Sequence, residues 1–182
     1  MKVVISAEGM PFNKMLVPYD SSIASDKAFS YALKIAKMSE ESGRNNRRES
    51  VITIILLHVL QEIPVPISYG GTPLSSLSKK TGERITFREY LKEVYQEMKA
   101  SAIKMLEQRT KKHTVSITNV KIKPEVTMGL PADKILEMAI DENVELIIMG
   151  TVGLTGVSKI KALGSVARNV SERAKCPVML IR

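Results

Sequence analysis

The sequence is poor in the residue types that build disulfides, metal sites and nucleic-acid stacking surfaces. Only one of its 182 residues is a cysteine, so Cys176 can form no internal disulfide, and a reducing cytoplasm is its simplest location. The two histidines, His58 and His113, belong to no cluster with the spacing of metal ligands. Tryptophan is absent and aromatic residues make up 4% of the chain, which disfavours binding by base stacking.

Long apolar runs are absent as well. No stretch approaches the ~20 residues of a membrane-spanning helix, and the apolar stretch near the N-terminus is too short for a secretory signal. With 44% hydrophobic and 25% charged residues, the composition is that of a globular protein. We expect a cytoplasmic protein with no membrane-bound part, folded as a single domain over residues 1–182.

Several catalytic motifs are also missing. The chain has no Gly-x-x-x-x-Gly-Lys-Ser/Thr phosphate loop, and no Gly-x-Gly-x-x-Gly follows its first expected strand. Neither histidine has a candidate serine or cysteine nucleophile beside it in the sequence. We therefore predict no catalytic residues, and at most a slow phosphoryl transfer, because no residue is a strong candidate to orient an attacking water.

Positive charge, in contrast, is plentiful and concentrated in one stretch. The net charge is +8, and the twelve Lys or Arg and five Glu between residues 79 and 123 account for +7 of it. This stretch is either a solvated helix face with pairs of opposite charge, or a surface for nucleic acid or an acidic partner. We favour the solvated face, which makes nucleic-acid binding the less favoured hypothesis.

Apolar runs and amphipathic stretches alternate along the chain. Buried strands are predicted over residues 14–18, 51–60, 146–149 and 177–181, and an edge strand with a bulge over 115–126, where Pro124 cannot donate a hydrogen bond. Helices are predicted after the capping residues Ser21 and Ser22, and from Glu83, Pro131 and Gly164. This order predicts an α/β fold, a five-stranded parallel sheet with helices on both faces.

Two features of these elements carry further expectations. His58 lies inside the second strand and is expected to be a core histidine that bonds to the backbone. Residues 61–82 are rich in Pro, Gly and Ser and predict a loop without regular structure, either a lid over a site or a variable insertion.

The stretch from Leu146 to Val170 has the features of a phosphate-binding loop. An apolar strand is followed by glycines at 150, 153, 156 and 164, and Gly164 and Ser165 open a helical pattern. Glycine lets backbone N–H groups approach an anion closely, and the first turn of a helix offers free donors and partial positive charge. Ligands of such sheets bind where the strand order reverses, here between the first strand, which ends at Val17-Pro-Tyr-Asp20, and the fourth.

These motifs resemble the universal stress protein family in its ATP-binding branch. The family pattern is Gly-x-x-Gly, nine residues, then Gly-Ser or Gly-Thr, and Gly150-Thr-Val-Gly153 with Gly164-Ser165 supply both ends. Leu57-His-Val59, Gly129-Leu-Pro-Ala-Asp133 and Cys176-Pro-Val178 extend the resemblance over nearly the whole chain. It implies a Rossmann-like fold of the adenine-nucleotide alpha-hydrolase type and a role in the stress response.

The resemblance also implies a ligand and the residues that hold it. ATP, with or without Mg²⁺, would bind at the junction of the first and fourth strands, and the protein would form a homodimer through strand 177–181. The adenosine would be bordered by Pro18, Tyr19, Asp20 and the backbone of Val59, and the ribose by Met149 and Gly150. The phosphates would lie against Gly153, Gly164, Ser165 and Val166.

Three departures from the family pattern keep a second hypothesis open. Ten residues instead of nine separate Gly153 from Gly164, and Val152 and Ala167 stand where the family often has polar side chains. Each lost polar contact is worth about 1 kcal/mol. The alternative is a nucleotide-independent interaction protein of the same fold.

Overall fold

The computed structural model describes residues 12–43, 51–63, 75–111, 119–152 and 163–182. Their core is a five-stranded sheet in the order β5-β2-β1-β6-β7, in which every neighbouring pair is parallel. The strands are β1 (Lys14–Pro18), β2 (Ile52–Leu60), β5 (Val120–Met128), β6 (Leu146–Gly150) and β7 (Val178–Ile181). The predicted α/β fold with a parallel five-stranded sheet is confirmed.

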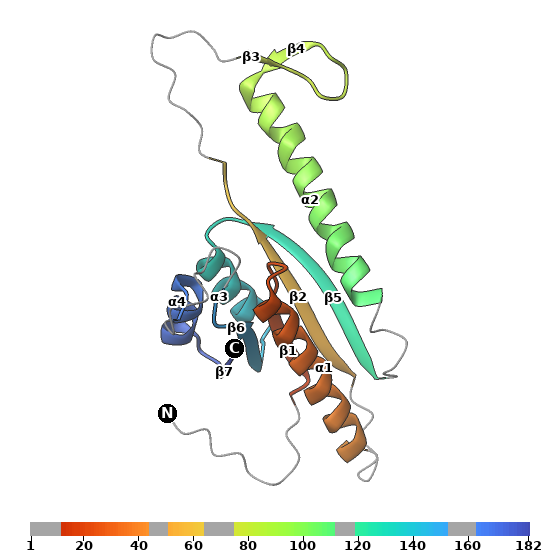
Figure 1. Cartoon of the computed structure of the whole chain (residues 1–182), viewed down its shortest axis with the longest axis vertical. Coiled ribbons are helices and arrows are strands. Elements are labelled where there is room, and N and C mark those ends of the chain that lie inside the picture. The colour runs from red at the N-terminus through yellow and green to blue at the C-terminus, as the bar shows by residue number, and fades with distance from the viewer. Residues whose placement is uncertain (1–11, 44–50, 64–74, 112–118, 153–162) are drawn as a thin grey trace.

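Helices cover both faces of this sheet (Figure 1). They are α1 (Ile23–Gly43), α2 (Phe87–Lys111), α3 (Pro131–Asp141) and α4 (Ser165–Arg173). On one face Met15 and Val17 of β1 pack in a core with Phe29 of α1 and Leu106 of α2. On the other face Leu16 packs with residues of α3 and α4, such as Ile135. The alternation along β1 follows from the two-residue period of a strand, so both of its faces are buried.

The ends of the helices follow the signals in the sequence. Ser22 caps α1, since its hydroxyl accepts a hydrogen bond from the N–H of Ser25 at 3.1 Å. Pro131 is the first residue of α3, where its missing N–H costs nothing. Both predicted starts are confirmed. Among the described residues, no helix combines the length and apolar character that crossing a membrane requires.

The edge strand β5 differs in its bounds from the prediction. It begins at Val120 and continues two residues beyond Val126. The bulge was predicted between Ile117 and Val120, and residues 112–118 lie outside the described part. Pro124 does lie in an edge strand, because β5 pairs with β2 alone. The outer side of β5 has no neighbouring strand, so the missing N–H of Pro124 breaks no hydrogen bond there.

The prediction of an irregular loop over residues 61–82 and a helix from Glu83 was wrong in part. The chain forms a short antiparallel hairpin, β3 (Ser75–Leu77) with β4 (Arg84–Thr86), and α2 starts only at Phe87. The start is set by a capping box, in which the Glu89 carboxylate accepts hydrogen bonds from the N–H and hydroxyl of Thr86 at 2.9 and 2.8 Å. The Thr86-x-x-Glu89 spacing was visible in the sequence. Residues 64–74 of the predicted loop lie outside the described part.

Candidate functional site

The candidate site lies at the carboxyl ends of β1 and β6, where the strand order reverses. From β1 the chain builds outward to β2 and β5, then returns to the other side of β1 to form β6 and β7. β1 and β6 are paired in parallel, with Leu16 opposite Ile147, so their carboxyl ends meet at one edge of the sheet. Ligands of open α/β sheets bind at such a reversal.

Tyr19 follows β1 directly, and its side chain belongs to the core. It is 6% exposed, and its hydroxyl donates a hydrogen bond to Asp26 Oδ1 at 2.7 Å. Burial is the main reason why the pKa of Tyr19 rises to about 12, and the Asp26 carboxylate adds to the effect. Asp26 also pairs with Arg109 of α2 at 2.9 Å. The phenol is thus committed inward, and only the backbone of Tyr19 can face a ligand.

Asp20 and Ser21 shape the turn between β1 and α1. Asp20 Oδ1 accepts a hydrogen bond from the N–H of Ser22 at 3.0 Å, which holds its carboxylate at the sheet edge. Ser21 has φ 67°, an uncommon left-handed conformation for a residue other than glycine. Its hydroxyl lies 2.8 Å from Met105 Sδ of α2. The turn that borders the site is therefore in contact with α2.

The next strand supplies His58 and Val59. His58 Nδ1 lies 2.7 Å from the carbonyl oxygen of Tyr19, so this nitrogen carries the proton and donates it to the backbone. The expectation of a histidine bonded to backbone is confirmed. Val59 pairs with Thr127 near the end of β2 and is partly buried against the α3 and α4 side of the core. The Tyr19 N–H donates to the carbonyl of Leu57 at 2.8 Å and joins the ends of β1 and β2.

Met149 and Gly150 end the other strand of the site. The Met149 side chain is 4% exposed and packs in the core, so only its backbone reaches the sheet edge. Gly150 touches the first turn of α1: a Cβ there would lie 2.6 Å from the Cβ of Ala24 and 3.0 Å from its carbonyl carbon. No other residue fits at position 150 without movement of the helix.

Thr151 and Gly164 close the base of the glycine loop. The N–H of Gly164 donates to the carbonyl of Thr151 at 2.8 Å, and Thr151 itself is 9% exposed. This bond places the start of α4 beside the end of β6. Gly153 and the rest of residues 153–162 lie outside the described part, so the loop contributes to the described site only through its two ends.

The N-terminus of α4 carries no side-chain cap. Gly164 is its N-cap residue in an extended conformation, and Ser165, the first helical residue, is exposed. The amides of the first turn therefore remain available to an anion, supported by the partial positive charge of the helix end. A hollow of about 320 Å³ reaches Ser165 and runs along the helix, lined by Leu163, Ser165, Arg168, Asn169 and Glu172.

The two residues that depart from the glycine motif differ in their exposure to solvent. Ala167 is 3% exposed and lies on the buried side of α4, so a hydroxyl at this position would face the core. Val152 is partly exposed and follows Thr151 at the base of the loop. Of these two residues, therefore, only Val152 places an apolar side chain where a ligand could contact it.

The chemistry that these residues offer is binding of an anion. Among the described residues no group of three His, Cys, Asp or Glu side chains could hold a metal ion. Glycine backbone, helix amides, the Asp20 carboxylate and the Ser165 hydroxyl provide donors and acceptors. Together these groups can hold a ligand through hydrogen bonds.

Sequence reasoning missed the residues that support this edge. Thr151, Ala24 and Asp26 each fix a residue of the site, through the contacts to Gly164, Gly150 and Tyr19. Their partners are distant in sequence or on another element, and no local motif marks such contacts. Within the described residues Arg109 Nε is buried without a hydrogen-bond partner, which the sequence did not indicate either.

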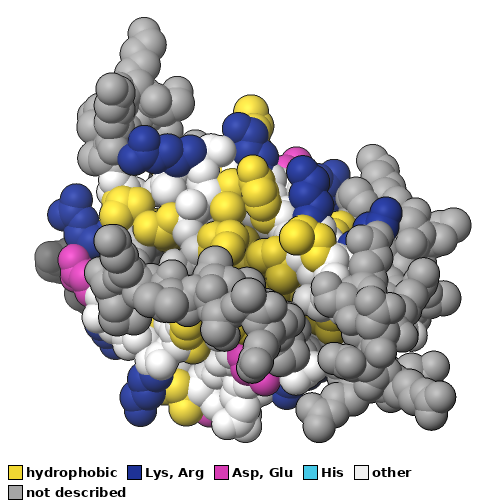
Figure 2. Space-filling view, turned by 90° about the horizontal axis from the view of Figure 1, so that it is seen from below, with side chains coloured by type: hydrophobic (Ala, Val, Ile, Leu, Met, Phe, Trp, Pro, Cys, Tyr) yellow, Lys and Arg dark blue, Asp and Glu magenta, His cyan; other side chains and the backbone are white. Residues whose placement is uncertain are grey.

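The basic stretch 79–123 is divided by the fold. Cations at both of its ends have acceptors: Lys79 binds Glu97 at 2.9 Å, and Lys123 binds Glu142 at 2.9 Å. On the face seen from below, hydrophobic side chains gather in the middle and separate groups of Lys and Arg surround them (Figure 2). Because cations at both ends are paired, the stretch does not form one continuous unpaired basic surface.

Comparison with known proteins finds relatives over nearly the whole chain. The profile of the Universal stress protein family matches residues 11–182. The universal stress protein MJ0531 of Methanocaldococcus jannaschii is 32% identical over 171 residues, which cover 94% of this chain and 82% of that protein. UspA of Lactobacillus plantarum shares the fold, with a TM-score of 0.69 at 22% identity and coverage of 95% and 99%. A universal stress protein solved in complex with cAMP has a TM-score of 0.52 at 19% identity and coverage of 94% and 97%.

Proposed function

Because the chain belongs to the universal stress protein family, we propose that it is a cytoplasmic stress-response protein that binds an adenine nucleotide, foremost ATP, between β1 and β6. The hydrogen bond from Gly164 to Thr151 carries this proposal, because it holds the uncapped N-terminus of α4 at the end of β6. The complex of a structural relative with cAMP supports an adenine nucleotide as the class of ligand.

Different residues would contact the adenosine, the ribose and the phosphates of the nucleotide. The backbone of Pro18 and Tyr19, the Asp20 carboxylate and the Val59 backbone border the adenosine. Met149 and Gly150 pass beneath the ribose, since their backbone reaches the edge while the Met149 side chain stays in the core. Gly164, Ser165 and Val166 receive the phosphates, together with Gly153 from the loop. Any Mg²⁺ is held mainly by phosphate oxygens and water.

Occupancy of this site acts on partners or assembly, with hydrolysis slow at most. The turn after β1 touches α2 twice, through Ser21 and Met105 and through Tyr19, Asp26 and Arg109. A ligand that reorders this turn has a direct route to α2. We propose that a homodimer forms through β7 (Val178–Ile181), which is the edge strand at the other end of the sheet from β5. The outer backbone groups of β7 pair with no strand of the described sheet.

Calorimetric titration with ATP, AMP and cAMP tests the proposal. Wild type is expected to show saturable binding, and Asp20→Asn is expected to weaken it about tenfold, the effect of one charge-assisted hydrogen bond. Asp141→Asn is the matched control, since Asp141 is an exposed carboxylate at the end of α3 and its loss is expected to change nothing. Absence of saturable binding in wild type at about 1 mM ATP, an affinity of roughly −4 kcal/mol, would refute the proposal.

A nucleotide-independent interaction protein is the second candidate. Val152, an apolar residue at the accessible base of the loop, favours it, because it removes a polar contact from the phosphate side. Mass spectrometry of heat-denatured protein purified without added nucleotide separates the two. Release of an adenine nucleotide in near-stoichiometric amount supports the first candidate, and release of none, together with no calorimetric binding, supports the second.

A further inference from the structure

The N-terminal half of α2 has no sheet beneath it. In Figure 1 the helix extends past the carboxyl ends of β2 and β5, and the β3–β4 hairpin sits at its far end. The buried residues of α2 are Ala102 and Leu106, both in its C-terminal half. Phe87, Leu91 and Tyr95 repeat at four-residue spacing ahead of them, as the apolar stripe of a helix that packs against something would.

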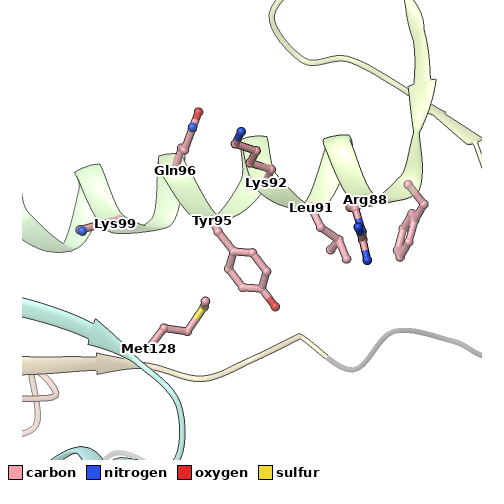
Figure 3. Close-up of a pocket in the computed structure, with 8 residues that line it drawn as sticks. Arg88, Leu91, Lys92, Tyr95, Gln96, Lys99 and Met128 are labelled. Carbon is pink, nitrogen blue, oxygen red and sulfur yellow. The ribbon is translucent and has the colours of Figure 1, made fainter.

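A groove of about 630 Å³ follows this stripe. Its apolar lining consists of Phe87, Leu91 and Tyr95 from α2 and of Met128, the last residue of β5. Leu91 and Tyr95 point from the helix toward the chain that leaves β2, and Met128 points from the end of β5 toward Tyr95 (Figure 3). The groove is open along α2 for about 18 Å, from residue 87 to residue 99 at 1.5 Å per residue.

Hydrogen bonds on two sides hold this helix in position, so the shape of the groove is determined by the fold. The Tyr95 hydroxyl accepts a hydrogen bond from the N–H of Ile63, in the segment that leaves β2, at 2.7 Å. On the opposite side the Glu93 carboxylate accepts from the Ser78 hydroxyl at 2.7 Å and from the Lys79 N–H at 3.0 Å. The hairpin therefore braces the half of α2 that the sheet does not support.

The hairpin occupies the acidic side chains in this half of α2 and leaves the basic ones without partners in it. All three acidic residues of its N-terminal half accept hydrogen bonds from residues 78–86: Glu89 from Thr86, Glu93 from Ser78, and Glu97 from Lys79. The cations that line the groove, Arg88, Lys92 and Lys99, have no ion pair or side-chain hydrogen bond within the described residues. An apolar floor with unpaired positive charge along its borders results.

We propose that this groove is a docking site for an amphipathic helix of another protein, with an apolar stripe flanked by Asp or Glu side chains. Such a helix buries Phe87, Leu91, Tyr95 and Met128 and brings carboxylates to Arg88, Lys92 and Lys99. A second copy of α2 is the wrong partner, because it would set these cations against their own copies. A nucleic acid would leave the apolar floor without a partner.

Fluorescence anisotropy with synthetic peptides tests the site on the full chain. The probe is a labelled helical peptide of about 14 residues, long enough to follow the stripe, with Leu at four-residue spacing and Glu on both flanks. One comparison peptide carries Lys in place of Glu, and another has the same composition with its apolar positions scrambled. Wild type is expected to bind the acidic amphipathic peptide with a Kd of the order of 10 μM, at least about tenfold tighter than either comparison peptide.

Charge reversal gives the sharpest contrast. The combined variant Arg88→Glu, Lys92→Glu and Lys99→Glu is expected to lose about tenfold or more in affinity for the acidic peptide and to gain the basic one. A matched variant, Lys37→Glu, Lys104→Glu and Lys175→Glu, makes the same change of net charge at exposed positions outside the groove and is expected to keep the wild-type preference. Equal thermal midpoints of the variants show that each one is folded.

Several outcomes would overturn the proposal. They are equal binding of acidic and basic peptides, equal loss in both charge-reversed variants, or no saturable binding at about 1 mM peptide. Binding of anionic phospholipid vesicles or duplex DNA that depends on the groove cations, without peptide binding, assigns the face to a membrane or nucleic acid instead. If the protein self-associates and Leu91→Ser abolishes the association, the groove binds a second copy of the chain. If the peptide binds only after residues 64–74 are replaced by a Gly/Ser linker, the groove is assigned to that segment. None of these results depends on whether the chain binds nucleotide.

Discussion

The N–H of Gly164 donates a hydrogen bond to the carbonyl oxygen of Thr151 at 2.8 Å, across thirteen positions of the sequence. This bond closes the glycine loop at its base, and the additional residue relative to the family pattern falls inside the closed segment. Loop closure entropy grows only slowly with length, so one more residue changes the cost of closure little. One additional residue is therefore compatible with the place of α4 beside β6.

Gly150→Ala is expected to destabilise the protein by about 2 kcal/mol, because the new methyl group would overlap the first turn of α1. The nearest atom would be the Ala24 Cβ at 2.6 Å, with the Ala24 backbone at 3.0 Å. Gly164→Ala is the comparison, since its nearest contact is the Thr151 carbonyl oxygen at 3.2 Å, and a loss below about 1 kcal/mol is expected. Urea denaturation measures both values, and equal losses would contradict the assigned role of the contact with Ala24.

Tyr19 is expected to make stability fall in alkaline solution. Its pKa is about 12 in the folded chain and 10.0 when unperturbed, so between these values the folded protein keeps a proton that the unfolded chain has lost. The stabilisation is complete below about pH 10, is lost as the pH rises through 12, and amounts to at most about 3 kcal/mol.

Chemical denaturation at several pH values checks this expectation, with Tyr19→Phe as the control. The variant keeps the ring and loses the ionisable hydroxyl, so its stability is expected to decline less steeply between about pH 10 and pH 12. At neutral pH it is expected to lose about 1 kcal/mol, the hydrogen bond to Asp26. Parallel curves for the two proteins would show that Tyr19 does not titrate with a raised pKa.

The sheet and its helices could be predicted because their signals are local. Apolar runs such as Ile52–Leu60 mark strands buried on both faces, and Ser22 and Pro131 mark helix starts. The position of the candidate site followed from the same order, since parallel strands place all carboxyl ends at one edge. The β3–β4 hairpin escaped prediction because its strands have three residues each, too few to show a period.

The roles of individual side chains at the site could not be predicted in the same way. Tyr19 stands beside Asp20 in sequence, yet one side chain is committed to the core and the other to the turn at the sheet edge. The difference is set by Asp26 and Arg109, the second of which lies on another element. Gly150 is likewise explained by Ala24, a contact that only the packing of α1 against β6 creates.

Glu142 is expected to make stability fall in acid. Hydrogen bonds from Lys123 and Lys14 hold the pKa of its carboxyl below the ordinary value. The folded state therefore binds a proton less readily than the unfolded chain, and the stabilisation present above that ordinary value is lost as the pH falls through the folded-state pKa. Because the lysines are partly exposed, the contribution is expected to stay below about 1 kcal/mol and to shrink in high salt.

Glu142→Gln tests this expectation by denaturation at neutral and acidic pH. The variant is expected to be less stable than wild type at neutral pH and equal to it in acid, where wild-type Glu142 is protonated. Asp141→Asn, a neighbouring exposed carboxylate with no side-chain hydrogen bond within the described residues, is expected to show no such convergence. A Glu142→Gln deficit that persists unchanged in acid would point to packing instead of charge.

Glu93→Ala is expected to loosen the hairpin and leave the sheet intact. The Glu93 carboxylate joins α2 to the hairpin through the Ser78 hydroxyl and the Lys79 N–H, and Ser78 also accepts hydrogen bonds from the N–H groups of Lys80 and Thr81 at 3.1 Å. Without it, the buried Ser78 hydroxyl loses an acceptor, at a cost of about 1 to 2 kcal/mol. β3 and β4 pair with each other and form a sheet separate from the five-stranded one, so the loss falls on that segment although Lys79–Glu97 and Lys80–Gln96 still join it to α2.

Amide hydrogen exchange resolves where this loss occurs. Residues 75–86 and the first turns of α2 are expected to exchange about tenfold faster in Glu93→Ala, while β1 and β2 keep their protection. Glu107→Ala is the control, because Glu107 is exposed on the same helix and its carboxylate has no partner within the described residues. If exchange rises equally in β2, the hairpin and the sheet open as one unit, and the hairpin cannot be an independent brace of the groove beneath α2.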